Sequence, residues 1–222
     1  MLHTVATGAA LLACLAATAA VPSSSSATAA LPSSATAALP SSSAAAPPPK
    51  KVLVSIVSAN GSGCPAGGMD VETDGTSFTL TYKDFAATTG PGSDPLDSRK
   101  NCQLALDVRA PQSWTWGIDR IVTRGTANLQ SGASGTQSTA YYWAGDAETD
   151  RIAYPFTGPV KGPWNRTHKI AKGDVSYLPC GASRYLNVNF ELKVDAGTAT
   201  GRNALTMNST SGSDFHVLWR KC

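Results

Sequence analysis

The first 49 residues of this 222-residue sequence contain no lysine, arginine, aspartate or glutamate, and all 18 basic and 15 acidic residues lie from Lys50 onward. Long apolar runs are also missing. The most apolar block, residues 8–20, is too short for a membrane-spanning helix, which needs about 20 apolar residues. We therefore expect no transmembrane segment, and a chain in which an uncharged N-terminal part precedes a charged C-terminal part.

The apolar block is followed by small residues, and Ala17-Thr18-Ala19 fits the small-x-small pattern at which signal peptidase cleaves. The other reading of this block is a buried helix of a cytosolic protein. That reading is less favoured because no neighbouring segment could pack on such a helix. We predict that residues 1–20 are a secretory signal peptide and that the mature protein is secreted and extracellular.

Residues 21–50 are rich in serine, alanine and proline, a composition that cannot bury enough apolar surface to offset the entropy lost on folding. We predict a disordered linker or propeptide, with serine and threonine residues open to O-glycosylation. The tract ends at Lys50-Lys51. This pair is either a processing site or a solvated pair that opens the first strand, so retention or removal of residues 21–50 stays open.

Residues 51–222 have the length of one domain, and they lack several signatures of chemistry. The net charge of +3 is scattered, with no basic cluster, which argues against a nucleic-acid partner. There is no G-x-S-x-G motif, no C-x-x-C spacing and only two histidines, His168 and His216. We therefore assign no catalytic residue, no metal ligand and no cofactor.

Five cysteines are present, and Cys14 falls within the predicted signal peptide. The remaining four allow three pairings, and an even count in a secreted chain predicts two disulfides. We favour the pairing that keeps the two halves of the domain separate. The predicted disulfides are Cys64–Cys102 and Cys180–Cys222.

Three Asn-x-Ser/Thr sequons occur in the predicted domain, at Asn60, Asn165 and Asn208. A glycan at any of them requires an exposed loop or strand edge. A single sequon arises easily by chance, whereas three in a secreted domain indicate that at least one is occupied.

Alternation of apolar and polar residues with a period of two dominates residues 51–222, and helical periodicity is almost absent. The clearest case is Leu186 to Val194, whose other face carries asparagine, glutamate and lysine. Asp74-Gly75 predicts a two-residue hairpin turn. Residues 84–90 are the one stretch in which we expect a helical turn. Nine or ten short strands separated by turns predict an all-β, two-sheet antiparallel sandwich, jelly-roll-like and stapled by disulfides.

The charged stretch at residues 97–108, DSRKNCQLALDV, has the form of a turn that leads into a strand. Asp97 suits the turn, and Cys102 staples the start of the strand. We expect Arg99 and Lys100 to reach solvent or to pair with a nearby carboxylate such as Asp94.

A series of segments occurs in an order that resembles a known family: SANGSGCPAGG, FTLTYKDFAATTGPG, DSRKNCQLALDV, TRGTANL, YYW, FTGP, a Pro-Cys pair and LNVNFEL. They resemble the domain of unknown function 4360 family, small secreted proteins found mainly in filamentous fungi. The likeness covers nearly all of residues 52–222. It implies a secreted β-rich domain, and it transfers no catalytic residue.

Aromatic residues cluster near the predicted turns, where exposed rings could stack on the C–H faces of sugars. The candidate carbohydrate contacts are Trp114, Trp116, Tyr142 and Trp143. The alternative is that strand alternation buries these rings in the core.

Our first expectation is a secreted, monomeric, non-enzymatic interaction module, effector-like, that binds an extracellular polysaccharide or a wall or host protein. The alternative is a carbohydrate-binding protein or a carbohydrate-active enzyme in which two loop carboxylates act as acid and base.

Overall fold

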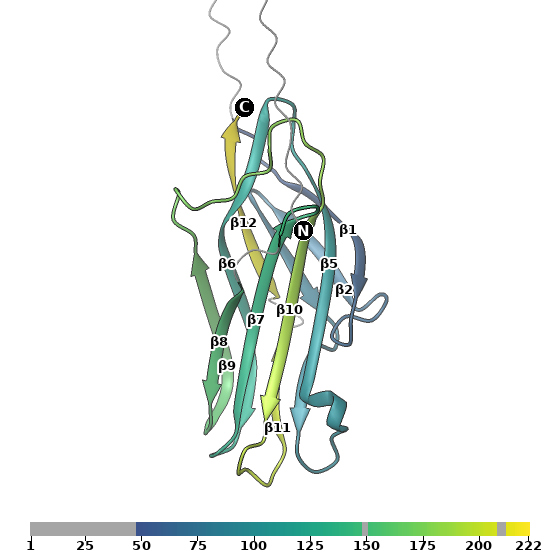
Figure 1. Ribbon diagram of the computed structural model, residues 1–222, viewed down its shortest axis with the longest axis vertical. Coiled ribbons are helices and arrows are strands. Elements are labelled where there is room, and N and C mark those ends of the chain that lie inside the picture. The colour runs from purple at the N-terminus through teal and green to yellow at the C-terminus, as the bar shows by residue number, and fades with distance from the viewer. Residues whose placement is uncertain (1–47, 148–150, 208–211) are drawn as a thin grey trace, which may run out of the picture. The chain divides into compact units, whose positions relative to one another are not determined.

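The computed structural model describes residues 48–147, 151–207 and 212–222, which form two antiparallel sheets (Figure 1). The five-stranded sheet has the order β1 (Leu53–Asn60), β5 (Arg99–Arg109), β10 (Leu186–Asp195), β7 (Ser134–Trp143) and β8 (Ile152–Thr157). The seven-stranded sheet runs β2 (Met69–Asp74), β3 (Ser77–Tyr82), β12 (Ser213–Lys221), β6 (Trp114–Leu129), β11 (Asn203–Met207) and β4 (Ala86–Thr89), with β9 (Val160–Lys169) paired to β6. The predicted all-β sandwich is therefore confirmed.

The core lies between the sheets and follows from the period-two pattern. On β10, Leu186, Val188, Phe190, Leu192 and Val194 are buried, and the residues between them face outward. The Phe190 ring meets the rings of Tyr82 and Phe215 from the other sheet edge-on, at centroid distances of 5.5 and 6.2 Å. Each such side chain contributes about 1.5–3 kcal/mol when fully buried, so these aromatic contacts hold the two sheets together.

Two local predictions have opposite outcomes. The hairpin predicted at Asp74-Gly75 is confirmed, but its two-residue turn is Gly75-Thr76, one residue later: Asp74 pairs with Ser77 as the last residue of β2, and Gly75 has a φ of 54°, a conformation that glycine adopts at little cost. The helical turn at residues 84–90 is wrong. Ala86–Thr89 forms β4 instead, because its backbone completes the ladder of β11, where Leu205 pairs with Ala87.

Both disulfides have the pairing favoured from the sequence. Cys64 is bonded to Cys102, and Cys180 to Cys222, with Cα–Cα distances of 5.3 and 5.8 Å. The first disulfide is buried in the core where β5 begins. The second joins the C-terminal residue to the loop before β10, at the end of the sandwich.

The charged stretch that leads into β5 is a strand entry, as predicted, but its ion pairs are not with Asp94. The Asp94 carboxylate accepts a hydrogen bond of 2.8 Å from the Leu96 amide and caps a short 3-10 helix, Pro95–Ser98. Lys100 pairs with Asp97 at 2.7 Å, and this hydrogen bond lowers the pKa of the Asp97 carboxyl below its usual value. Arg99 reaches across the sheet to Glu191 on β10.

The described residues contain no helix long and apolar enough to cross a membrane. The predicted signal peptide at residues 1–20, the predicted linker up to residue 47, and the Asn208 sequon lie outside the described residues.

Candidate carbohydrate-binding surface

Two of the four predicted carbohydrate contacts are core residues. The Trp116 side chain is 0% exposed and that of Trp143 is 5% exposed, and their rings meet edge-on with centroids 4.5 Å apart. Trp143 lies opposite Leu186, so it shares the inward face of the five-stranded sheet. The prediction that Trp116 and Trp143 contact carbohydrate is therefore wrong, because the alternation of their strands directs both rings between the sheets.

The other two predicted aromatics are half-buried and lie at the same end of the sandwich. Tyr142 lies opposite Asn187 on the outer face of the five-stranded sheet, and Trp114 begins β6. A further ring, Tyr185, is 47% exposed and was not predicted. Tyr185 directly precedes Leu186, so extension of the β10 alternation by one residue would have identified its outward position.

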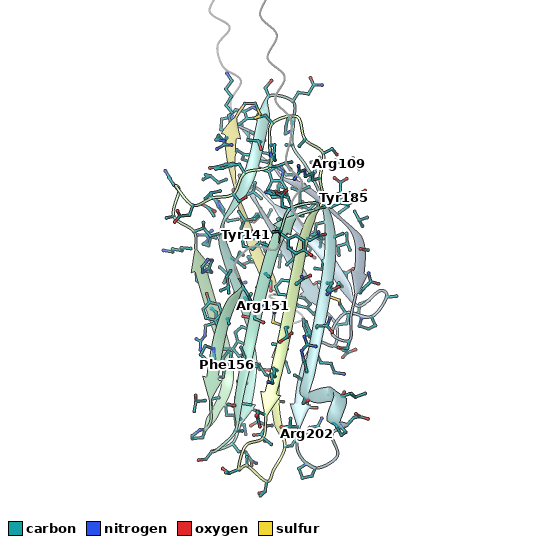
Figure 2. All side chains as sticks on the ribbon, in the orientation of Figure 1. Arg109, Tyr141, Arg151, Phe156, Tyr185 and Arg202 are labelled. Atoms are coloured by element: carbon teal, nitrogen blue, oxygen red, sulfur yellow. A yellow bond between two sulfur atoms is a disulfide. The ribbon has the colours of Figure 1, made fainter. Side chains whose placement is uncertain are left out.

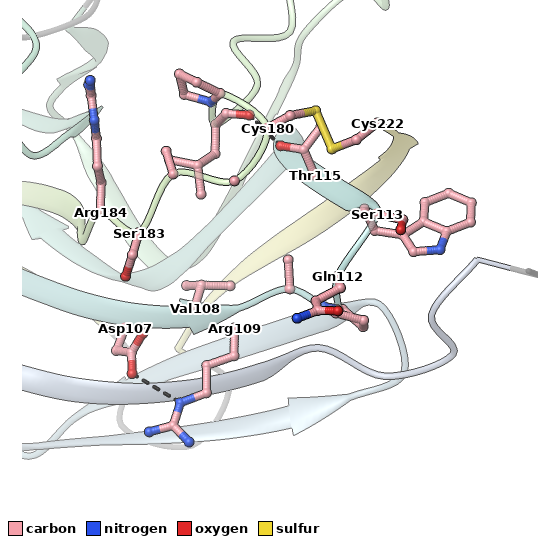
Figure 3. A pocket seen from close by; sticks show the side chains of 17 residues that line it. Asp107, Val108, Arg109, Gln112, Ser113, Thr115, Cys180, Ser183, Arg184 and Cys222 are labelled. Atoms are coloured by element: carbon pink, nitrogen blue, oxygen red, sulfur yellow. Dashed lines mark hydrogen bonds and ion pairs between the residues drawn. A yellow bond between two sulfur atoms is a disulfide. The ribbon is translucent and has the colours of Figure 1, made fainter.

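A cleft of about 470 Å³ opens beside these aromatics, at the end of the sandwich that holds the C-terminus (Figure 3). We call it the end cleft. Its walls are the last residues of β5, the turn that leads into β6, the loop before β10, and the C-terminal residue. The lining is formed by residues 107–115, 178–184 and 222.

The walls of the end cleft are tied together by covalent and backbone bonds. The Cys180–Cys222 disulfide joins the loop to the end of β12, and the Cys222 amide donates to the Ser113 carbonyl at 2.9 Å. The buried Thr115 hydroxyl donates to the carbonyl of Leu178. These bonds hold the cleft open before any ligand arrives, which reduces the entropy lost on binding.

The loop before β10 also packs closely on β6. A Cβ atom at Gly117 would lie 2.6 Å from Val175 Cγ1 and 2.7 Å from the Ser176 carbonyl oxygen, so only glycine fits there. The Arg220 guanidinium lies 3.9 Å from the centroid of the Tyr177 ring. The loop that forms one wall is thus seated firmly on the sheet.

Ser113 stands at the lip of the cleft with a φ of 70°, the only non-glycine residue with a positive φ among the described residues. A non-glycine residue in this region carries roughly 1–3 kcal/mol of strain. Such strain persists where the surroundings impose it, here through the bond between Ser113 and Cys222, and it often marks a functional site.

Two arginine–carboxylate pairs provide the charged groups near the cleft. Arg109 Nε lies 3.1 Å from Asp107 Oδ2 on β5, and Arg184 Nη1 lies 2.5 Å from Asp146 Oδ1 (Figure 3 shows the first pair). Pairs this exposed contribute at most about 1 kcal/mol to stability. Each guanidinium has five N–H donors, so those outside these contacts can donate to the hydroxyl groups of a ligand.

The polar lining continues from the cleft onto the outer face of the five-stranded sheet. Tyr185 and Arg109 lie near the same end of β10 and β5 (Figure 2). Beyond them, cross-strand pairing places Asn187 beside Ala105 and Tyr142, and Asn189 beside Gln103 and Ala140. Asn101 and Glu191 form the next row. Side-chain amides both donate and accept hydrogen bonds, as sugar hydroxyls do. We call this surface the amide face.

The loop carboxylates that could serve as an acid–base pair are Asp70, Glu72, Asp84, Asp94, Asp97, Glu148 and Asp150. None of those that the structure describes lines the end cleft. Asp94 caps the 3-10 helix and Asp97 pairs with Lys100, which makes both part of the strand entry. Glu148 and Asp150 lie outside the described residues. Among the residues that are described, no three histidine, cysteine, aspartate or glutamate side chains come together.

One hydroxyl–imidazole–carboxylate chain does form, on the outer face of the seven-stranded sheet. His216 Nδ1 lies 2.5 Å from Asp119 Oδ1, and His216 Nε2 lies 3.2 Å from Thr76 Oγ1. Hydrolase triads have this order. Here the chain lies on an open strand face and joins the β2–β3 turn to β12 and β6. We interpret it as a clasp that fixes the His216 ring.

The sequence matches the Domain of unknown function (DUF4360) family over residues 50–222. This chain belongs to the DUF4360 family. An "Uncharacterized secreted protein" of Arthroderma benhamiae is 32% identical over 179 residues, which cover 78% of this chain and 73% of that protein.

Two solved structures resemble this DUF4360 chain weakly. TmCBM61, solved in complex with beta-1,4-galactotriose, has a TM-score of 0.30 and 10% identity, over 76% of this chain and 88% of its own. The enzymatically active domain of Bacteriophage CBA120 tailspike protein 4 has a TM-score of 0.24 and 11% identity, over 77% and 19%. Neither likeness is close enough to support an inference about the function of this chain.

The two described sequons of the DUF4360 domain are exposed, on different sheets. Asn60 ends β1 opposite Gln103, at the edge of the amide face. Asn165 lies on β9 opposite Arg124, on the outer face of the seven-stranded sheet. Glycosylation of either residue stays a prediction. Neither residue lines the end cleft.

Proposed function

We propose that this chain is a secreted, non-enzymatic module that binds an extracellular polysaccharide through the end cleft and the adjoining amide face. Removal of residues 1–20 would release the protein, and residues 21–50 would act as a spacer or propeptide. The secreted relative and the two disulfides, which form in oxidising compartments, support this location.

The end cleft is the observation that carries the proposal. It combines the Trp114 ring, the Gln112 amide, the Ser113 and Thr115 side chains, and the Asp107–Arg109 pair in one hollow of about 470 Å³. Pockets for small organic groups have volumes of roughly 300–1,000 Å³. An apolar ring with a few polar groups beside it matches a sugar, which has C–H faces and a rim of hydroxyls.

The amide face extends the same chemistry along the sheet. From Tyr185 to Asn189 the strand advances about 14 Å at roughly 3.4 Å per residue, so a chain of several sugars can lie along it. Neutral amides predominate there, with Glu191 paired to Arg99 and Arg151. The surface therefore suits a neutral, hydroxyl-rich polymer better than a charged one.

Binding to insoluble chitin, β-glucan, cellulose and mannan tests the proposal. The wild-type protein should be retained on at least one of them. Tyr185→Ala should weaken that binding about tenfold, because an exposed ring at a recognition surface commonly contributes more than 1 kcal/mol. Leu96→Ala is the matched control, since Leu96 is an apolar side chain that is 81% exposed at the opposite end of β5.

Three outcomes would count against the proposal. Retention on none of the four polymers removes it, and so does binding that Tyr185→Ala and Leu96→Ala weaken equally. Release of reducing sugar ends from a retained polymer would establish the carbohydrate-active enzyme instead.

A further inference from the structure

Three basic side chains lie in a row on the outer face of the seven-stranded sheet, whereas the amide face belongs to the five-stranded sheet. Cross-strand pairing places Lys169 on β9 beside Arg120 on β6, and Arg120 beside His216 on β12. Figure 1 shows the ribbons of β6, β9 and β12. We call these three residues the basic row.

A β-bulge in β6 places Arg120 opposite His216 in this row. The pairing of β12 with β6 shifts between His216 and Val217, so that Arg120 lies opposite His216 whereas Ile118 lies opposite Val217. Asp119 is the extra residue, and its carboxylate meets His216 Nδ1 at 2.5 Å. Bulges of this kind redirect side chains and are frequent beside functional sites. Here the bulge brings Asp119 to the same face as Arg120 and fixes the imidazole.

Arg120 and Lys169 have no ion-pair partner within residues 48–147, 151–207 and 212–222, and both are exposed. Like charges directly opposite each other on neighbouring strands destabilise a sheet. By contrast, Arg124, four residues along β6, is compensated by an ion pair, because Asp214 Oδ2 lies 2.6 Å from Arg124 Nη1. An anion from outside the chain would relieve the repulsion between these two cations.

A groove of about 490 Å³ runs along the basic row and supplies neutral donors beside it. Ser77, Thr167 and Asn165 line it along with the three basic residues. Asp74 and Asp214 are its acidic residues, and Asp214 is held by Arg124 and by the Thr79 hydroxyl at 2.7 Å. A second hollow, of about 260 Å³, continues past Asp119 and Ile170.

We infer that this groove binds an acidic polysaccharide, with sugar carboxylates held by Arg120 and Lys169. The planar guanidinium of Arg120 offers a forked pair of donors that matches a carboxylate. The Lys169 ammonium adds a point charge beside it, and the hydroxyl groups of Ser77 and Thr167 suit the sugar hydroxyls. Asp74, on β2 at the other side of the row, disfavours a second anion there, so the carboxylates lie over β6 and β9.

The inference is independent of the end cleft, because the two sites share no residue. Asn165 lines the groove four residues from Lys169, about 14 Å along an extended strand. A glycan at Asn165 would reach into the groove. The experiment therefore uses Asn165→Gln protein as its background.

The experiment compares polygalacturonate with the same polymer after full methyl esterification, which removes the charge and keeps the sugar backbone. Binding is measured by affinity electrophoresis at low ionic strength. Arg120→Gln/Lys169→Gln should weaken polygalacturonate binding at least tenfold. The control Lys161→Gln/Lys193→Gln removes two exposed lysines elsewhere and should change it less than twofold. Tyr185→Ala should leave it unchanged.

Equal binding of the two polymers would overturn the inference, as would no binding of polygalacturonate. Equal weakening by the test and control variants would show a diffuse charge effect and would also overturn it. Equally tight binding of duplex DNA would mean that the groove recognises any polyanion, against the inference. Circular dichroism on each variant checks that the sandwich is intact. Loss of polygalacturonate binding with normal retention on neutral polymers would leave the proposed function standing.

Discussion

The end cleft and the basic row are built by opposite means. The walls of the cleft are held in place by a disulfide and by backbone hydrogen bonds, with one residue in a strained conformation, and its groups are aromatic, amide or already paired. The basic row is an open strip of a sheet, placed by one bulge, with two cations left uncompensated. Shape therefore defines the first site, and charge defines the second.

This difference shows how one sandwich can present two chemistries. A sheet face has a fixed spacing between neighbouring side chains, so its selectivity comes from which residues lie side by side across the strands. A cleft at the end of the sandwich depends on loops, which must be anchored to keep a shape. Experiments that remove anchors should affect the cleft, and experiments that screen charge should affect the basic row.

Loss of the Cys180–Cys222 disulfide should have the largest effect on binding by the end cleft. Cys180→Ala/Cys222→Ala opens a loop with a sequence separation of 42 and should lower the free energy of unfolding by about 4 kcal/mol. Polymer retention by the end cleft should be lost, whereas polygalacturonate binding should persist below the melting temperature. Chemical denaturation and the two binding assays measure these effects.

The other disulfide provides the control for this prediction. Cys64→Ala/Cys102→Ala opens a loop with a sequence separation of 38, so the loss of stability should be similar or larger, since these cysteines are buried. Retention by the cleft should survive at low temperature, because neither residue lines it. Equal loss of retention in both variants would contradict the role we give to the Cys180–Cys222 anchor.

Alkaline pH should destabilise the core on which the end cleft rests. Burial raises the pKa of the Tyr82 hydroxyl well above its usual value, and the hydroxyl donates to Ser213 Oγ at 2.9 Å. The folded protein then keeps a proton that the unfolded chain releases near pH 10. The contribution of the protonated Tyr82 hydroxyl to the free energy of unfolding should be fully present below pH 10. Above pH 10 the free energy of unfolding should fall by about 1.4 kcal/mol per pH unit.

Denaturation of Tyr82→Phe between pH 9 and pH 12 checks this prediction, because the variant should show a smaller alkaline decline. Ser213→Ala keeps the buried hydroxyl and should retain the full decline. In the wild-type protein, retention by the cleft should be lost at the pH at which circular dichroism reports unfolding. Loss of retention well below that pH would show that the cleft does not depend on this core.

Salt should weaken binding at the basic row much more than binding at the end cleft. Raising sodium chloride from 50 to 500 mM shortens the screening length to roughly a third. Polygalacturonate binding should weaken about tenfold, because Arg120 and Lys169 act through exposed charge, whereas retention by the cleft should change less than twofold. Titrations at both salt concentrations measure this contrast, and parallel weakening of the two would contradict it.

Ser113→Gly should have the smallest effect. Glycine adopts a φ of 70° without the steric cost of a side chain, and this gain is partly offset by the greater freedom of the unfolded chain. We expect a rise in the free energy of unfolding of about 0.5 kcal/mol and slightly weaker polymer binding by the end cleft. Ser113→Ala should show no rise, and a stabilisation equal to that of the glycine variant would argue against strain at this position.

The sequence predicted the fold from residues whose position in a strand is readable locally. The alternation of Leu186 to Val194, the β2–β3 hairpin, whose turn lies one residue later than predicted, and the pairing of the four cysteines of residues 51–222 were readable in this way. Tyr185 was within reach of the same reasoning, one residue before β10. By contrast, Trp116 and Trp143 were misjudged because clustering near turns does not show on which side of a strand a ring lies.

The clasp at His216 was out of reach, for a reason of distance along the chain. Asp119 and His216 are 97 residues apart, and Thr76 and His216 are 140 apart. Their contact depends on the pairing of β12 with β6 and on a one-residue bulge within that pairing. Nothing in the local pattern around Asp119 distinguishes a bulged residue from a regular one.

By itself, then, the sequence determined what its local patterns and composition can express: a β-rich domain stapled by cysteines, preceded by 49 residues that contain no lysine, arginine, aspartate or glutamate. The tertiary structure alone decided which side chains meet. It joined the ends of β5, β6 and β12 into a cleft, and it set Lys169, Arg120 and His216 side by side. The reason is that strand register is a long-range property, and a shift of one residue turns every side chain of a strand to the other face.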